Sequence, residues 1–164
     1  MFLNKRYEQA SVAFSRARQD RVAKICDAYF LREKARFVST TASETRIRVF
    51  VTAAKAFTTL ARDSTSEEVN ERLAHERLAY YAAAGECYQE ARDLKNAGDN
   101  YCIAEQYPAA ACAYREGEHF DEMMEVINRH RDAIDGGLIE RLKTDAKVHY
   151  FKVYPNSRPA AKCV

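Results

Sequence analysis

The placing of glycine and proline constrains this chain more than any other feature of its sequence. The chain has 164 residues, and all five glycines and all three prolines lie at or beyond Gly85. These two residue types are the strongest helix breakers. Alanine, the best helix former, occurs 27 times. No segment shows the sustained apolar and polar alternation of a strand. The sequence therefore predicts an all-α protein.

Apolar residues in the first third recur at steps of three and four, which predicts helices. The first such stripe runs from Leu3 to Ala17, and a second begins at Val22. The shift falls at Arg18–Asp20, where residues 4–38 form either two helices with a tight turn or one continuous helix. Hydroxyl-rich breaks at residues 39–43 and 63–68 separate the helices that follow.

A short pattern repeats in the second half. Ala84–Ala91 and Ala97–Ala104 both read Ala-Gly-acid-x-Tyr-x-x-Ala, and they begin thirteen residues apart. A glycine lets two helices approach closely, and a tyrosine three residues later lies on the same helix face. Pro108 suits the first turn of a helix. The short period predicts antiparallel helical hairpins stacked in series, with Gly136-Gly137 ending one helix before the last.

The stretch from Leu94 to Gly117 resembles a tetratricopeptide (TPR) repeat. It has the Gly-x-x-Tyr of the first helix, a tyrosine at the turn, and the Ala-x-x-x-Tyr of the second helix. It departs from the repeat because Gly117 replaces the usual alanine and no proline closes the unit. The expected structural positions of the motif are Gly85, Tyr88, Ala91, Leu94, Ala97, Gly98, Tyr101, Tyr107, Ala110, Tyr114 and Gly117.

Two further stretches, Asp27–Arg36 and Phe120–Lys152, are similar to the helical-repeat region of large fungal TPR-and-ankyrin proteins that carry a superfamily 1 helicase core. The resemblance implies a right-handed α-solenoid of about seven or eight helices. We expect one domain over residues 1–154, with long helices in 1–63, shorter hairpins in 64–135 and a final helix in 138–154. Residues 155–164 are expected to be a disordered tail.

The sequence carries little that points to catalysis. No lysine follows any glycine, so a phosphate loop is not predicted. Asp121-Glu122-Met123-Met124 opens an amphipathic pattern and is interpreted as a helix start. The four histidines have no i, i+4 spacing, and the five cysteines have no Cys-x-x-Cys spacing. We therefore expect neither an enzyme nor a metal or cofactor site.

Cysteine usage bears on the compartment. Cys26, Cys87, Cys102 and Cys112 fall among alanine, tyrosine and isoleucine, so we expect buried, reduced thiols, while Cys163 lies in the tail. Reduced thiols are typical of the cytoplasm or nucleus. No run of eighteen apolar residues is present, so no membrane span is predicted. An intracellular protein is expected.

Charge is divided into opposed blocks. Residues 1–63 hold 13 Lys+Arg against 6 Asp+Glu, and residues 64–139 hold 7 against 16. The basic side chains either bind nucleic acid phosphates or neutralise the acidic block across the fold. The candidate nucleic-acid residues are Arg16, Arg18, Arg21, Lys24, Arg32, Lys34, Arg36, Arg46 and Arg48.

The leading functional hypothesis is a non-catalytic scaffold that binds a protein partner, as an accessory module of a helicase-like protein. The alternative is a nucleic-acid-contacting module that uses the basic N-terminal helices. Tyr80 and Tyr107 are candidates to line a groove for a peptide. Self-association is expected if the ends of the stack expose apolar surface.

Overall fold

The computed structural model describes residues 2–38, 43–63 and 71–153. Within these ranges the chain is helical and contains no strand. The helices are α1 (Phe2–Arg16), α2 (Asp20–Phe37), α3 (Ser43–Asp63), α4 (Glu71–Glu90), α5 (Leu94–Ile103), α6 (Tyr107–Glu116), α7 (Phe120–Arg129), the 3-10 turn η2 (Arg131–Ala133) and α8 (Gly136–Val153). The all-α prediction is confirmed.

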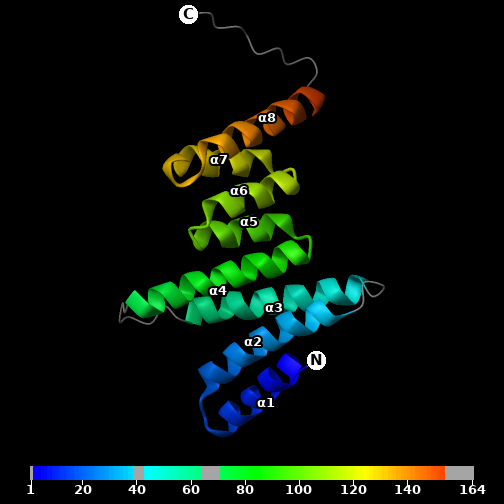
Figure 1. Ribbon diagram of the computed structural model, residues 1–164, viewed down its shortest axis with the longest axis vertical. Helices are drawn as coiled ribbons and strands as arrows, with labels where there is room; N and C mark the ends of the chain where they lie inside the picture. The colour runs from blue at the N-terminus through cyan, green and yellow to red at the C-terminus, as the bar shows by residue number, and fades with distance from the viewer. Residues whose placement is uncertain (1, 39–42, 64–70, 154–164) are drawn as a thin grey trace, which may run out of the picture.

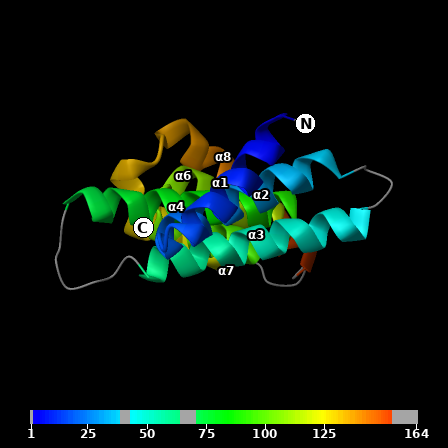
Figure 2. The ribbon, with the colours of Figure 1, turned by 90° about the horizontal axis from the view of Figure 1, so that it is seen from below.

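The helices form an elongated stack. The chain runs back and forth across the long axis, from α1 at one end to α8 at the other (Figure 1). Each helix packs on the one that follows it, and α6 also contacts α8. Seen along the long axis the helices overlie one another, with α1 and α2 nearest the viewer (Figure 2).

Four of the connections share one tight turn. In each, the central residue has a positive φ of 56° to 61°, and these residues are Arg18, Arg92, Glu105 and Glu118. At Glu105, the N–H of Gln106 donates to the Tyr101 carbonyl at 2.9 Å, and the N–H of Glu105 donates to the Cys102 carbonyl at 3.1 Å. This is the Schellman pattern, which usually has glycine at the left-handed position. The turn at Arg18 makes α1 and α2 two separate helices.

The thirteen-residue pattern continues further than its sequence suggests. Helices α5, α6 and α7 begin at Leu94, Tyr107 and Phe120, thirteen residues apart. The position of the motif alanine is occupied by Ala97, Ala110 and Met123 in the three helices. The position of the glycine is occupied by Gly98, Ala111 and Met124, and that of the tyrosine by Tyr101, Tyr114 and Ile127. In α7, methionines replace the small residues and Ile127 replaces the tyrosine, which is why the pattern is hidden there.

Glycine and tyrosine interlock between successive helices. A Cβ atom on Gly85 would lie 2.8 Å from ring carbons of Tyr101, and one on Gly98 would lie 2.5 Å from Cε1 of Tyr114. Each glycine therefore accommodates the tyrosine of the next helix, sixteen residues later, and not the tyrosine of its own unit. This contact sets the spacing of α4, α5 and α6.

The core runs along the stack and is rich in alanine. Its largest fully buried side chains are Phe50, Phe57, Cys87, Met123 and Ile127. Tyr29 meets Phe57 edge-on at 5.1 Å between ring centroids, and Phe57 is followed by Tyr80 at 6.5 Å. Tyr80 is therefore a buried core residue, and the prediction that it lines a groove is wrong.

The C-terminal boundary differs from the prediction. Gly136 and Gly137 begin α8, whereas they were expected to end the preceding helix, which already stops at Arg129. The reason is Asp135, whose Oδ2 accepts the N–H of Leu138 at 2.9 Å and so caps α8. The expected tail, residues 155–164, lies outside the described residues.

Candidate functional site

The nine candidate basic residues divide into two groups. Arg16, Arg18, Arg21 and Lys24 lie around the start of α2, and the other five lie at its end and at the start of α3. On α2 the nearest members of the two groups, Lys24 and Arg32, are eight residues apart, which is about 12 Å along the helix axis. The basic side chains therefore fall into two clusters with a gap between them.

Five of the nine make ion pairs. Arg21, Arg32 and Arg46 reach Glu76, Glu86 and Glu90 of α4, at 3.0, 3.6 and 2.9 Å. Lys24 pairs with Asp63, and Arg36 with Glu33. Part of the basic block is thus neutralised by acidic residues across the fold, although exposed pairs of this kind stabilise by only about 0–1 kcal/mol.

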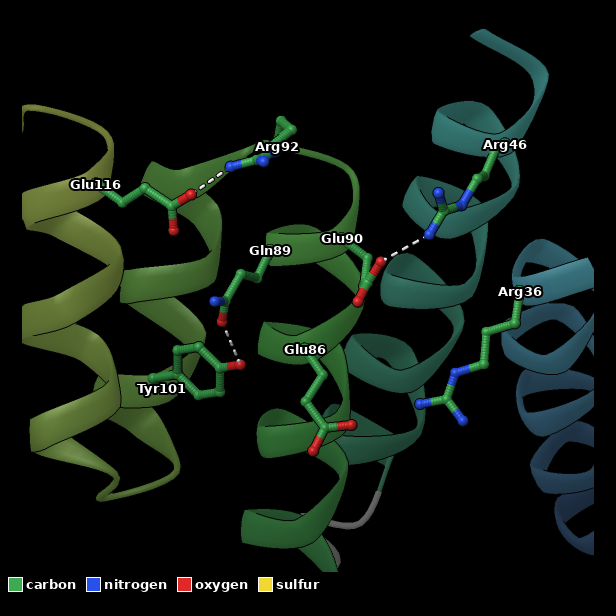
Figure 3. Close-up of a pocket in the computed structure, with 8 residues that line it drawn as sticks. All are labelled: Arg36, Arg46, Glu86, Gln89, Glu90, Arg92, Tyr101 and Glu116. Carbon is green, nitrogen blue, oxygen red and sulfur yellow. Dashed lines mark hydrogen bonds and ion pairs between the residues drawn. The ribbon is translucent and has the colours of Figure 1, made fainter. Parts of the chain in front are cut away.

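A charged hollow of about 570 Å³ lies on the side of the stack where α2, α4 and α6 end (Figure 3). Its lining residues come from α2 to α6: Arg36, Arg46, Glu86, Gln89, Glu90, Arg92, Tyr101 and Glu116. Because neighbouring helices run in opposite directions, the ends of α2, α4 and α6 converge here with the start of α3. Residues as distant in sequence as Arg36 and Glu116 share this surface.

The charges of the charged hollow are balanced within it. Arg46 pairs with Glu90, and Arg92 in the α4–α5 turn pairs with Glu116 at the end of α6. The Tyr101 hydroxyl donates to Oε1 of Gln89 at 2.9 Å (Figure 3). Burial, as the largest cause, raises the pKa of Tyr101 to about 12. At neutral pH this phenol is therefore a hydrogen-bond donor and not a base.

A second, aromatic hollow of about 470 Å³ lies on the side where α5 and α7 end. It is lined by Asp99, Cys102, Ile103, Tyr107, Tyr114, Glu122, Glu125, Val126, Arg129 and His130. The rings of Tyr107 and His130 stack with centroids 3.6 Å apart. Tyr107, one of the two predicted groove residues, does line a hollow.

Tyr114 is the buried polar centre of the aromatic hollow. Its hydroxyl donates to Oδ1 of Asp99 at 2.6 Å and lies 3.9 Å from Sγ of Cys102. Burial is the largest cause that raises the pKa of the Tyr114 phenol, and the hydrogen bond to Asp99 adds to it. Burial also raises the pKa of the Cys102 thiol. Both groups are protonated at neutral pH.

The two hollows are the same site displaced by one repeat. Adding thirteen to Glu86, Gln89, Glu90, Tyr101 and Glu116 gives Asp99, Cys102, Ile103, Tyr114 and Arg129, which all line the aromatic hollow. The shift places the second hollow on the opposite side because each helix reverses the direction of the one before. Sequence reasoning missed both hollows, although the thirteen-residue period was the signal that could have related them.

The cysteines depart in part from the prediction. Cys87 is buried, Cys26 and Cys102 are half-buried, and Cys112 is exposed. The expectation of four buried thiols is therefore wrong for Cys112, which lies on the outer face of α6. All four are free thiols. Among the residues that the structure describes, no group of three or more His, Cys, Asp or Glu side chains could hold a metal ion.

Comparisons of the chain with protein-family models, curated proteins and solved structures found no match. The function must therefore be argued from the geometry of the chain itself. None of the described helices has the length and apolar character needed to cross a membrane.

Proposed function

We propose that this chain is a non-catalytic scaffold that binds a segment of a partner protein in the charged hollow. The observation that carries the proposal is the convergence of five helices on one hollow whose rim presents three guanidinium groups and three carboxylates. A hollow of this size is within the usual range of binding sites, but small-molecule pockets are mostly apolar. A polypeptide with side chains of both signs fits this lining better.

The ion pairs on the rim of the charged hollow are weak enough to be exchanged for ion pairs with a partner protein. The Arg46–Glu90 pair is formed by side chains that are 32% and 53% exposed. Pairs this exposed stabilise the fold little, so they can be replaced by pairs to a partner at small cost. Arginine is also among the residues enriched in protein interfaces.

The finer fold assignment is part of the same proposal. We infer a right-handed, TPR-like α-solenoid, because four of the connections between antiparallel helices share one tight turn and α4, α5 and α6 interlock through glycine and tyrosine. In repeat proteins, stacked hairpins of this kind provide extended binding surfaces. The proposed context, an accessory module of a helicase-like protein, rests on the sequence resemblance. The free thiols support an intracellular location.

The test is a selection of displayed random peptides on the immobilised protein. Selected peptides are labelled, and their affinities are measured by fluorescence anisotropy for the wild type and for an Arg36→Glu/Arg92→Glu double variant. The variant reverses two of the three cations of the rim. We expect peptides of mixed charge that bind the double variant about tenfold more weakly, as for lost interface charge pairs.

The matched control is Lys55→Glu, which reverses an exposed cation on α3 outside the hollow. Circular dichroism establishes that all variants keep the helical content of the wild type. Equal binding to the wild type and the double variant would place the partner elsewhere and overturn the proposal. So would a selection that yields no peptide specific for the protein.

A further inference from the structure

We propose that the aromatic hollow binds a lysine or arginine side chain from a partner protein, with the Asp99 carboxylate as its acceptor. No residue of this hollow lines the charged hollow. The inference therefore stands or falls separately from the function proposed above.

The comparison of the two equivalent hollows carries the argument. In the charged hollow, three arginines balance three glutamates. The residues that line the aromatic hollow include three carboxylates, of Asp99, Glu122 and Glu125, and a single guanidinium, that of Arg129. The lining of the charged hollow therefore carries as many cations as carboxylates, whereas the lining of the aromatic hollow has an excess of carboxylates.

The ion pairs of the aromatic hollow single out one carboxylate. Arg129 pairs with Glu125 at 2.5 Å, and Lys95, which does not line the hollow, pairs with Glu122 at 2.8 Å. Asp99 accepts the Tyr114 hydroxyl and makes no ion pair in the described part of the chain. A carboxylate accepts several hydrogen bonds, so Asp99 can keep Tyr114 and bind a cation as well.

Backbone dipoles add to this preference. The C-terminal ends of α5 and α7, at Ile103 and Arg129, both line the hollow. The C-terminus of a helix carries about half a negative charge and favours cations. The N-terminus of α6, at Tyr107, also lines the hollow and has the opposite sign, but the two C-terminal ends together with Asp99 leave a net preference for positive charge.

The apolar lining suits the stem of a long cationic side chain. Ile103 is 50% exposed on the rim, and the stacked Tyr107 and His130 rings form a wall beside it. Lysine and arginine bury their methylene groups on such surfaces while the charged head stays polar. A short or purely apolar side chain would leave Asp99 without a cation.

The experiment is a titration of the ¹⁵N-labelled full chain with N-acetyl-arginine amide, followed by two-dimensional NMR. We expect saturable shifts at the amides of Asp99, Ile103 and His130. Asp99→Asn removes the charge but keeps an oxygen that accepts the Tyr114 hydroxyl, so the fold is retained. We expect affinity for the probe to fall about tenfold in this variant, because a charge-assisted bond is lost.

The matched control is Glu86→Gln at the equivalent position of the charged hollow, which should leave those shifts unchanged. N-acetyl-leucine amide is the probe for an apolar occupant. Saturable shifts at the same amides with this probe would overturn the proposal. Equal affinity of Asp99→Asn and the wild type for the arginine probe, or shifts spread over all surface carboxylates, would also overturn it.

Discussion

The ring of Tyr114 lies directly against the α-carbon of Gly98, on the neighbouring helix. A methyl group at Gly98 would sit 2.5 Å from Cε1 and 2.6 Å from Cζ of this ring. The ring is also held by its hydroxyl, which donates to Asp99. Tyr114 therefore has little freedom to move away, and the separation of α5 from α6 depends on the absence of a side chain at Gly98.

We expect Gly98→Ala to destabilise the protein by up to about 2 kcal/mol. Alanine favours the helix by about 1 kcal/mol over glycine, but overpacking costs about 1–3 kcal/mol and the clash here is with a fixed ring. Urea unfolding followed by circular dichroism measures the difference. The control is Gly136→Ala, where an added Cβ would meet nothing within 4 Å. Equal effects of the two substitutions would contradict this account.

We expect glycine at position 105 to stabilise the α5–α6 turn. Glu105 has a φ of 60°, a conformation that costs an L-residue about 1–2 kcal/mol. The greater unfolded-state freedom of glycine offsets about 0.4–1 kcal/mol. Glu105→Gly should therefore raise the free energy of unfolding by about 0.5–1 kcal/mol. Cys112→Gly, at an exposed position in the middle of α6, should lower it because glycine is unfavourable inside a helix, and a rise in both variants would contradict the prediction.

Stability should fall in alkali as the buried tyrosines titrate. The pKa of Tyr101 is raised from 10.0 to about 12 in the folded chain, so the folded state retains a proton that the unfolded state loses between these values. The contribution to stability is complete below pH about 10 and is lost as the pH rises to about 12. Thermal melts across this range should show a steeper decline for the wild type than for Tyr101→Phe. Parallel declines would argue against Tyr101.

Oligonucleotide binding should be weak and confined to low salt, because five of the nine candidate basic residues are already ion-paired. We expect log K for single-stranded DNA to fall against log salt with a slope of about −0.7 per phosphate contacted. Arg16→Glu/Arg18→Glu at the exposed α1–α2 turn should weaken this binding, because it reverses two of the four candidate residues that are not ion-paired. Anisotropy with a labelled oligonucleotide measures this. Tight binding at physiological salt would favour the nucleic-acid alternative.

The helices were predictable from the sequence because their signals are local. Apolar periodicity placed the long helices, and Pro108 marked the first turn of α6 as expected. The turns were harder to predict. Their left-handed positions, where glycine would have indicated a turn, are occupied by Arg18, Arg92, Glu105 and Glu118. Gly136-Gly137 predicted the end of a helix, but the pair begins α8 because Asp135 caps that helix.

The candidate site was not predictable, because it depends on which helix ends meet. Arg36 and Glu116 share the charged hollow only once five helices have stacked. The same holds for the ion pairs of Arg21, Arg32 and Arg46 with α4, which divide the basic residues into paired and exposed ones. The sequence could offer pairing and nucleic-acid binding only as alternatives.

The packing of each helix mainly on its neighbours in sequence has a kinetic consequence. Contacts that are local in sequence need little loop closure, so a chain of this kind should fold quickly for its length. Because each helix packs mainly on its neighbours in sequence, the interfaces between helices can open one at a time. Opening one interface, such as the one at Gly98, leaves the helices on either side intact. A partner that pulled on α1 or α8 would then extend the molecule by opening one helix–helix interface after another.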